Sequence, residues 1–429
     1  MRSAIRHWLW IAVVLLPLAS ACESDDAENG GHDHDHGDHD DLDDHSDKGD
    51  GHDHDHDAAV PSMVDSGVEP VDGSVAAGFE WRLPSGFPRP AVPADNPMTP
   101  EKVELGRHVF YDKRLSDNQT FSCATCHKQE LAFADDRPVG FGSTGQFHTR
   151  GAMSLANVAY SPTLTWANPL MTELERQAQV PIFGDDPIEL GMMSIEEVES
   201  RFRAVPRYQE LFATAFPEAT QPITMENLLK ALSAFERTII SGNSAYDKFS
   251  NGDDAALSES AKRGMLFVTT NEDHRFECNH CHGGFNFSDH VTWEGLEQAG
   301  ESPPYHQTGL YDLDGKGTYP DPNTGVYNTS LNPDDMGKFK APTLRNVALT
   351  PPYMHDGSIT TLSDVLEHYS KGGRARNASK TDPLLKTFPI TAREKADIIA
   401  FLESLTDYDL LKDPAFSDPW PAEVNAVQQ

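Results

Sequence analysis

The 429-residue chain has few cysteines, few basic residues and no long hydrophobic run. Four of its five Cys fall in two short motifs, so no disulfide framework can be read from their spacing. Its 34 Lys and Arg stand against 68 Asp and Glu, a formal net charge of -34. This balance argues against nucleic acid or an anionic membrane surface as a partner. Convincing strand patterns are also missing, which favours a fold of helices and loops.

Residues 1–22 have the features of a secretory leader. Arg2 and Arg6 precede an apolar run that is too short for a confident transmembrane helix. The small residues 19–21 resemble a cleavage site, and the segment ending at Cys22 resembles a lipoprotein box. We therefore expect a periplasmic protein with a lipid anchor at Cys22. The alternative is ordinary cleavage, which would leave a soluble periplasmic protein.

Residues 23–78 are of low complexity and rich in His and Asp. The segments 31–36 and 51–56 are near repeats in which His and Asp alternate. Such a composition cannot bury a core, so this linker is expected to be disordered. Imidazole beside carboxylate suits weak binding of copper or zinc, and the alternative is a solvated spacer.

Two segments match the attachment motif of a c-type haem, C-x-x-C-H. Two thiols on one turn can add to the haem vinyl groups, and the adjacent His supplies an axial nitrogen to the iron. The alternatives are a redox C-x-x-C pair or a zinc site, although a redox pair does not require the trailing His. The residues concerned are Cys123, Cys126 and His127 in the first motif, and Cys278, Cys281 and His282 in the second.

Similar helix signals surround both motifs. Thr99 with Pro100, and Ser258, predict helix starts ahead of the first and second motifs. An amphipathic helix from Thr224, expected to end at Gly242, follows the first motif. A helix over 391–405, opened by the capping box of Thr391 and Glu394, follows the second.

This repetition predicts a mainly α protein built from two tandem cytochrome c-like domains. Each domain would surround one covalently bound haem, with long Pro- and Gly-rich loops between helices. The expected boundaries are 79–243 for the first domain and 244–409 for the second, followed by a C-terminal tail over 410–429.

Over about residues 80–408 the chain resembles the bacterial di-haem cytochrome c peroxidase family, which includes MauG. Within that family it resembles the methanobactin-associated di-haem enzymes called MbnH. The segments that carry the resemblance, besides the haem motifs, are 83–88, 95–98, 155–160, 165–169, 339–346 and 352–357.

The resemblance implies a role for each haem. The haem on His127 would react with hydrogen peroxide, and the haem on His282 would store or relay an oxidising equivalent. Trp166 would carry charge between them. Gln177, Pro181 and Glu189 would lie over the first haem, with Glu189 as general acid and base. The alternatives are a buried core aromatic for Trp166 and a solvent-exposed Glu at a helix start for Glu189.

The sixth ligand of the second haem distinguishes members of the family, which use Met or, in MauG, Tyr. The resemblance places this ligand 17 residues after Pro352, at Tyr369, with Met354 as the competing candidate. Ordinary peroxidases often place a removable His over the first haem. His148 is the nearest candidate, but its surroundings do not match that motif, so an open first iron is expected.

The family also binds calcium between its domains. The resemblance implies that Thr350 and Pro352 offer backbone carbonyls to this ion, which favours oxygen ligands. The third family ligand is an Asn, and the aligned residue here is Gly151.

These features predict a hydrogen-peroxide-dependent di-haem oxidoreductase. By resemblance to MbnH, it would form a high-valent state and oxidise a partner protein. The expected partner is a copper-binding MbnP-like protein of the periplasm, with one Trp converted to kynurenine. The first alternative is a peroxidase that reduces peroxide to water with electrons from a small cytochrome or copper protein. The second is a non-enzymatic di-haem electron carrier or metal-binding lipoprotein.

Overall fold

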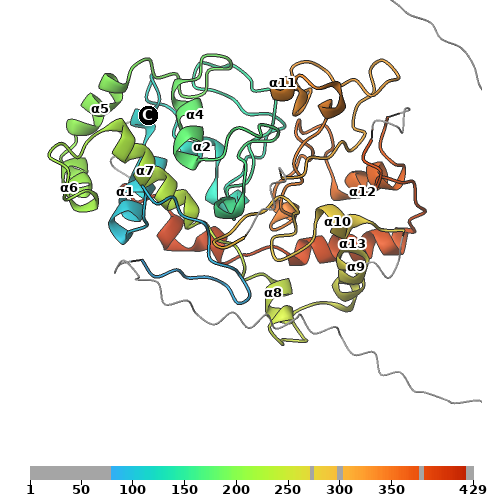
Figure 1. Cartoon of the computed structure of the whole chain (residues 1–429). Coiled ribbons are helices and arrows are strands. Elements are labelled where there is room, and N and C mark those ends of the chain that lie inside the picture. The colour runs from blue at the N-terminus through green and yellow to red at the C-terminus, as the bar shows by residue number, and fades with distance from the viewer. Residues whose placement is uncertain (1–78, 271–274, 297–302, 376–380, 422–429) are drawn as a thin grey trace, which may run out of the picture. The chain divides into compact units, whose positions relative to one another are not determined.

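The computed structural model describes residues 79–270, 275–296, 303–375 and 381–421. The predicted leader, the lipid anchor at Cys22 and the His/Asp-rich linker lie outside these residues. Within them the regular elements are helices, and backbone pairing of the strand type is limited to isolated bridges. The expected mainly α fold is therefore confirmed for the described part of the chain (Figure 1). None of its helices has both the length and the apolar content that crossing a membrane requires.

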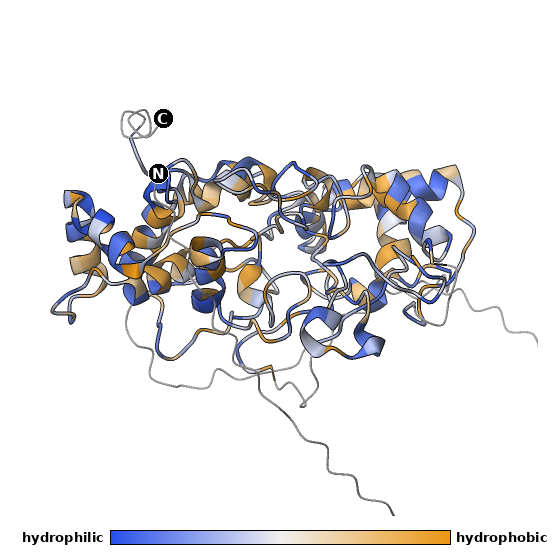
Figure 2. Ribbon diagram, turned by 90° about the horizontal axis from the view of Figure 1, so that it is seen from above, coloured by the Kyte–Doolittle hydropathy of each residue, from blue (hydrophilic) through white to orange (hydrophobic). Residues whose placement is uncertain are grey.

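Thirteen α-helices occur among the described residues, several of them a single turn. In chain order they are α1 Pro100–Phe110, α2 Cys123–Cys126, α3 Leu174–Gln177, α4 Gln179–Phe183, α5 Ile195–Arg203, α6 Pro206–Ala215, α7 Met225–Arg237, α8 Ala245–Ser250, α9 Glu259–Thr269, α10 Cys278–Cys281, α11 Tyr327–Ser330, α12 Leu362–Ser370 and α13 Ala392–Ser404. The longer ones carry hydrophilic and hydrophobic residues side by side (Figure 2), as amphipathic helices that cover a core do.

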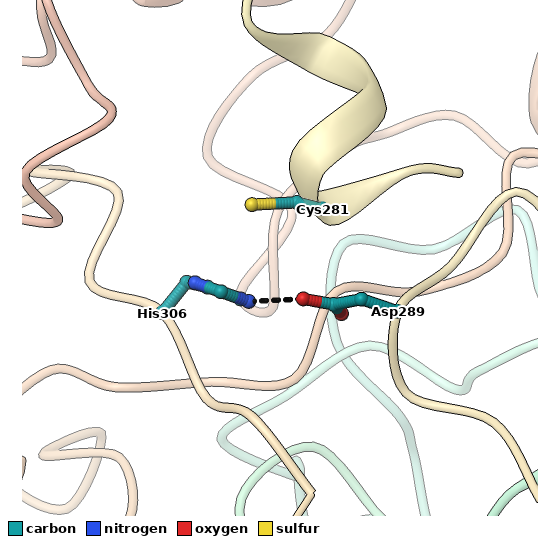
Figure 3. A group of neighbouring side chains, drawn as sticks. All are labelled: Cys281, Asp289 and His306. Carbon is teal, nitrogen blue, oxygen red and sulfur yellow. Dashed lines mark hydrogen bonds and ion pairs between the residues drawn. The ribbon is translucent and has the colours of Figure 1, made fainter. Parts of the chain in front are cut away.

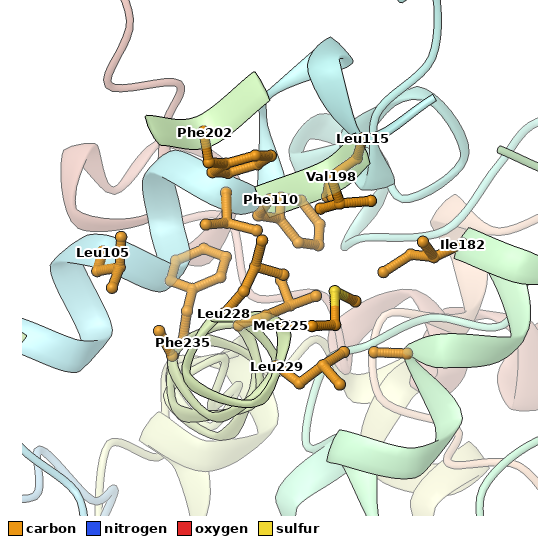
Figure 4. Close-up of a cluster of buried hydrophobic side chains, with 14 of the residues drawn as sticks. Leu105, Phe110, Leu115, Ile182, Val198, Phe202, Met225, Leu228, Leu229 and Phe235 are labelled. Atoms are coloured by element: carbon orange, nitrogen blue, oxygen red, sulfur yellow. The ribbon is translucent and has the colours of Figure 1, made fainter. Parts of the chain in front are cut away.

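Helices α1 and α7 cross at very close range in the first half of the chain. A Cβ atom added to Gly106 would lie 1.9 Å from the carbonyl oxygen of Ala231, so only glycine allows this crossing. Thr99 caps α1, whose first residue is Pro100, and the Thr224 side chain accepts a hydrogen bond from a first-turn amide of α7. The apolar faces of both helices enter the core shown in Figure 4.

Helices α9 and α13 repeat this arrangement in the second half. A Cβ atom on Gly264 would lie 1.9 Å from the carbonyl oxygen of Asp397, which is the counterpart of the contact at Gly106. Ser258 caps α9, and Thr391 with Glu394 forms the expected capping box of α13. The matching glycine contacts support the internal duplication inferred from the sequence. The exact domain boundaries stay a prediction.

The prediction that α7 continues to Gly242 is wrong, because the helix ends at Arg237. Beyond that point, Asn157 forms hydrogen bonds with the backbone of the chain. Its backbone N–H donates to the Ile239 carbonyl at 2.8 Å. Its side-chain amide donates to the carbonyl of Ser241 and accepts from the N–H of Ser241. These tertiary hydrogen bonds replace the helical ones, while Ile239 remains fully buried. Periodicity alone cannot reveal such competition.

The described residues of the predicted C-terminal tail pack against the core of the first half, which is the one shown in Figure 4. Leu410 belongs to that core, and the Tyr111 hydroxyl donates to the carbonyl of Phe416 at 2.7 Å. The Trp420 indole nitrogen donates to the carbonyl of His108 at 3.0 Å. The chain therefore returns, after the second half, to the helices with which its described part begins.

Candidate active site

Both C-x-x-C-H motifs form a single helical turn followed directly by the histidine. The amide nitrogens of His127 and His282 donate to the carbonyls of Cys123 and Cys278 at 2.9 and 2.8 Å. All four thiols are free in the structure. Each turn therefore presents two unpaired sulfurs and an imidazole from adjacent positions, which is the donor set that the motif predicts.

Both histidines are held in the same tautomer by a backbone carbonyl. Nδ1 of His127 donates to the Phe133 carbonyl at 2.9 Å, and Nδ1 of His282 donates to the Phe287 carbonyl at 3.2 Å. Burial lowers the pKa of each imidazole and keeps it neutral. Nε2 is therefore left with a free lone pair, which is the state required of a metal ligand.

A cavity of about 590 Å³ adjoins the first motif and gathers most of the residues predicted for the first haem. Its walls include Cys123, Cys126, His127, Trp166, Gln177, Pro181 and Glu189. Glu189 lies in a turn between α4 and α5 and not at a helix start, and its side chain is 30% exposed. Burial, followed by the carboxylates of Asp135 and Glu189, raises the pKa of Cys126. The Glu189 carboxylate thus lines the same cavity as the motif and interacts with it electrostatically.

Trp166 lies on the same cavity and is fixed at both its backbone and its ring. Its indole nitrogen donates to the carbonyl of Gly151 at 2.9 Å, and its own carbonyl accepts a hydrogen bond from the amide of Lys340 at 3.0 Å. It packs against a small core that includes Phe339 and Ile359. The ring is therefore held rigidly beside the space that the first motif faces.

Two buried ionisable residues of the cavity wall were not predicted from the sequence. The ammonium of Lys340 donates to Ser161 Oγ at 2.9 Å and to the Thr163 carbonyl at 3.1 Å, and no carboxylate among the described residues pairs with it. Burial lowers its pKa to about 7. Burial also raises the pKa of Glu236, on α7, to about 8. Lys340 stands in a segment that carried the family resemblance, but its burial left no signal in the sequence.

Tyr369 lies on α12, and its phenol interacts electrostatically with the thiols of the second motif. Burial raises the pKa of this phenol above its ordinary value, and the neighbouring sulfurs of Cys281 and Cys278 raise it further. Met354, the competing residue, instead lines the cavity at the first motif and takes a left-handed backbone with φ of 70°. Met354 thus lies at the cavity of the first motif, and Tyr369 as the ligand at the second motif stays a prediction.

A second group that sequence reasoning missed surrounds His306, close to Cys281 (Figure 3). Nε2 of His306 lies 2.7 Å from Asp289 Oδ2, and Nδ1 lies 2.6 Å from Asp382 Oδ2. Although burial alone would lower it, hydrogen bonds to the two carboxylates raise the pKa of His306 to about 12. Cys281, Asp289 and His306 are close enough to hold a metal ion together. However, a thiol that carries a haem is a thioether and a poor ligand.

Comparison with known proteins decides the family. A family model described as di-haem cytochrome c peroxidase matches residues 100–255. The methylamine utilization protein MauG of Methylorubrum extorquens is 35% identical over 330 residues, which cover 76% of this chain and 83% of MauG. The cytochrome-c peroxidase IdrP1 of Pseudomonas sp. strain SCT is 34% identical over 355 residues, 79% of this chain and 90% of IdrP1. The chain belongs to the di-haem cytochrome c peroxidase family.

Solved structures agree with this membership. The crystal structure of a MauG-like protein associated with microbial copper homeostasis is 47% identical to this chain. It aligns with a TM-score of 0.77 over 80% of this chain and all of that one. The di-haem peroxidase BthA of Burkholderia thailandensis, at 21% identity and a TM-score of 0.58, shares the fold. As a member of the family, the chain is a hydrogen-peroxide-dependent oxidoreductase of the di-haem type.

The residues of this family member fit the two c-type haems that the family implies. Each motif offers two free thiols and a neutral imidazole, and the first adjoins a cavity with the Lys340 amino group, which has no carboxylate partner among the described residues. A haem carries two carboxylate groups, so a buried cation without a carboxylate partner suits one of them. The peroxidase pocket thus combines sulfur, nitrogen and cationic groups in one place.

The calcium site expected of a di-haem peroxidase remains a prediction. Thr350 and Pro352 line the cavity, as does Gly151, whose amide donates to the carbonyl of His355 at 2.9 Å. The three segments therefore meet, although the group of metal-binding side chains found among the described residues lies elsewhere, at Cys281.

Proposed function

We propose that this di-haem peroxidase uses hydrogen peroxide to oxidise a partner protein in the periplasm. The partner would be a copper-binding MbnP-like protein, and one of its Trp side chains would be converted to kynurenine. The observation that carries the proposal is the gathering of Glu189, Gln177 and Pro181 on one cavity with His127. The similarity to a MauG-like protein associated with copper homeostasis favours a copper-related partner.

When bound, the haem on His127 supplies an iron that takes peroxide and accepts its oxidising equivalents. Glu189 acts on the protons. Its carboxylate removes a proton from one peroxide oxygen and returns it to the other, which leaves as water. Gln177 and Pro181 line the cavity in which peroxide would bind. The Gln amide orients the oxidant, and the Pro ring excludes water.

Trp166 would relay charge from the first haem site toward the second. Its Nε1–H donates to the carbonyl of Gly151, whose partial negative charge stabilises an indole that has lost an electron. A rigid ring also reorganises little during electron transfer. Both properties suit a relay better than they suit a purely structural aromatic.

Tyr369 would hold the iron of the second haem together with His282. Burial raises the pKa of its phenol, so the phenol stays neutral unless a cation replaces its proton. A ferric iron is such a cation, and an anionic oxygen donor favours high oxidation states, whereas a Met sulfur favours the reduced metal. Tyr369 thus supports the partner-oxidising function over simple electron uptake from a donor.

Three finer features belong to the same proposal. Thr350 and Pro352 would offer carbonyl oxygens to a calcium ion. Cys22 would carry a lipid that anchors the protein in the periplasm, and the His/Asp-rich linker would bind copper or zinc weakly.

The function is tested by product analysis of the partner. We expect that hydrogen peroxide and this enzyme together convert a Trp of the copper-binding partner to kynurenine, as detected by mass spectrometry of its peptides. Omitting peroxide or the enzyme should abolish the change. Steady turnover with a reduced small cytochrome, and an unmodified partner, would instead favour the peroxidase that only reduces peroxide to water.

A further inference from the structure

His148 contacts Glu189, the residue that we expect to transfer protons. In the family resemblance, His148 is the nearest candidate for a removable iron ligand. Its Nε2 atom lies 2.9 Å from Oε1 of Glu189. Both side chains line the cavity at the first motif. Nε2 is buried from solvent and makes no hydrogen bond among the described residues, so the approach to Glu189 is a close polar contact outside hydrogen-bond geometry. The contact joins two loop segments that are far apart in the sequence.

A short hairpin presents His148 to this place. Phe141 and Phe147 form an antiparallel bridge, and the amide of His148 donates to the carbonyl of Gly140 at 2.8 Å. Two further backbone bonds close the turn, from Gly142 to Gln146 and from Gly145 to Gly142. The backbone position of His148 is therefore fixed by pairing on both sides.

The hairpin is docked directly on the segment that carries Glu189. The amide of Ser143 donates to the carbonyl of Glu189 at 2.7 Å, and the amide of Ile188 donates to Gln146 Oε1 at 2.7 Å. At Gly142 an added Cβ atom would lie 1.8 Å from the carbonyl oxygen of Ile188. A glycine is needed for this approach, so the two segments are packed directly against each other.

We propose that His148 is a positioning residue for Glu189. The imidazole holds one carboxylate oxygen and thereby selects the side-chain rotamer in which the other oxygen faces the peroxide pocket. His148 exchanges no proton in this role and acts through the carboxylate alone. An imidazole in contact with Glu189 would also be unavailable to the iron, which agrees with the open first haem that we expect. This inference rests on the proposed function of Glu189.

The test is a double-mutant cycle on peroxide reactivity, measured by stopped-flow absorbance of the resting di-haem protein. We expect His148→Leu to slow the reaction by up to about 100-fold, since small misplacements of a reacting group have effects of this size. His148→Gln should recover most of the rate, because its amide nitrogen reaches the same carboxylate oxygen. In a Glu189→Gln background, His148→Leu should cause no further loss. Phe147→Leu, on an exposed residue of the same hairpin, is the matched control.

Cyanide association supplies a readout that does not depend on turnover. Hydrogen cyanide must lose its proton to bind ferric iron, so its association rate should fall in His148→Leu and in Glu189→Gln alike. Wild-type rates in His148→Leu, or an additional loss in the Glu189→Gln background, would overturn the positioning role. A wild-type peroxide rate in Glu189→Gln would instead contradict the acid–base step of the proposed function.

Discussion

Replacing Glu189 by Gln is expected to slow the reaction with hydrogen peroxide by about 10²- to 10⁴-fold, the usual contribution of a positioned general acid and base. The amide has nearly the shape of the carboxylate but cannot accept the peroxide proton. The contact with His148 and the docked backbone of the Ser143 hairpin should keep the loop in place. The loss would therefore be chemical and not a consequence of unfolding.

The measurement is the rate at which the absorbance of the resting haems changes after mixing with peroxide. Glu196→Gln, an exposed carboxylate in the first turn of α5, is the matched control and should react like the wild type. An undiminished rate in Glu189→Gln would exclude this carboxylate as the proton carrier. It would also revive the view of the protein as an electron carrier.

Replacing Trp166 by Phe is expected to reduce oxidation of the partner Trp to the level seen without enzyme, while the first haem site still consumes peroxide. Phe retains the ring shape but is much harder to oxidise, and it lacks the N–H that donates to Gly151. The lost hydrogen bond should lower the free energy of unfolding by only about 1 kcal/mol. Trp166→Phe should therefore still consume peroxide but no longer oxidise the partner, whereas the wild type couples these two activities.

Mass spectrometry of the partner, together with peroxide consumption, measures both activities in one experiment. Trp293→Phe is the matched control, because Trp293 packs on Phe285 and lies outside the cavity wall at the first motif. Unchanged oxidation of the partner in Trp166→Phe would contradict the proposal that Trp166 relays charge between the haem sites. Loss of peroxide consumption as well would indicate a structural role for the ring.

Local signals predicted the parts of this protein that depend on local chemistry. Thr99 with Pro100, and Thr391 with Glu394, begin helices where expected, because capping is decided within one turn. Tyr369, reached by counting from Pro352, lies on α12, and its role as a ligand of the second haem stays a prediction. The resemblance likewise placed Glu189, Gln177 and Pro181 on one cavity.

Features that depend on distant contacts were not predictable. The end of α7 is decided by Asn157, which lies far before it in the chain, and the partner of Glu189 is a histidine on a separate hairpin. His306 lies between two carboxylates at unrelated spacings, and the burial of Lys340 follows from segments that meet only in the folded chain. The residue pattern of a single segment cannot predict contacts between segments that are distant in the sequence.

The central claim is that one haem is open to the oxidant while the other is bound by a phenol oxygen. Electron paramagnetic resonance of the resting di-ferric protein tests it directly, with Tyr369→Phe measured alongside. The account predicts a high-spin signal from the open first haem, and a second haem without methionine character whose signal changes in Tyr369→Phe. A six-coordinate low-spin first haem, or a methionine-bound second haem that is unaffected by Tyr369→Phe, would contradict it.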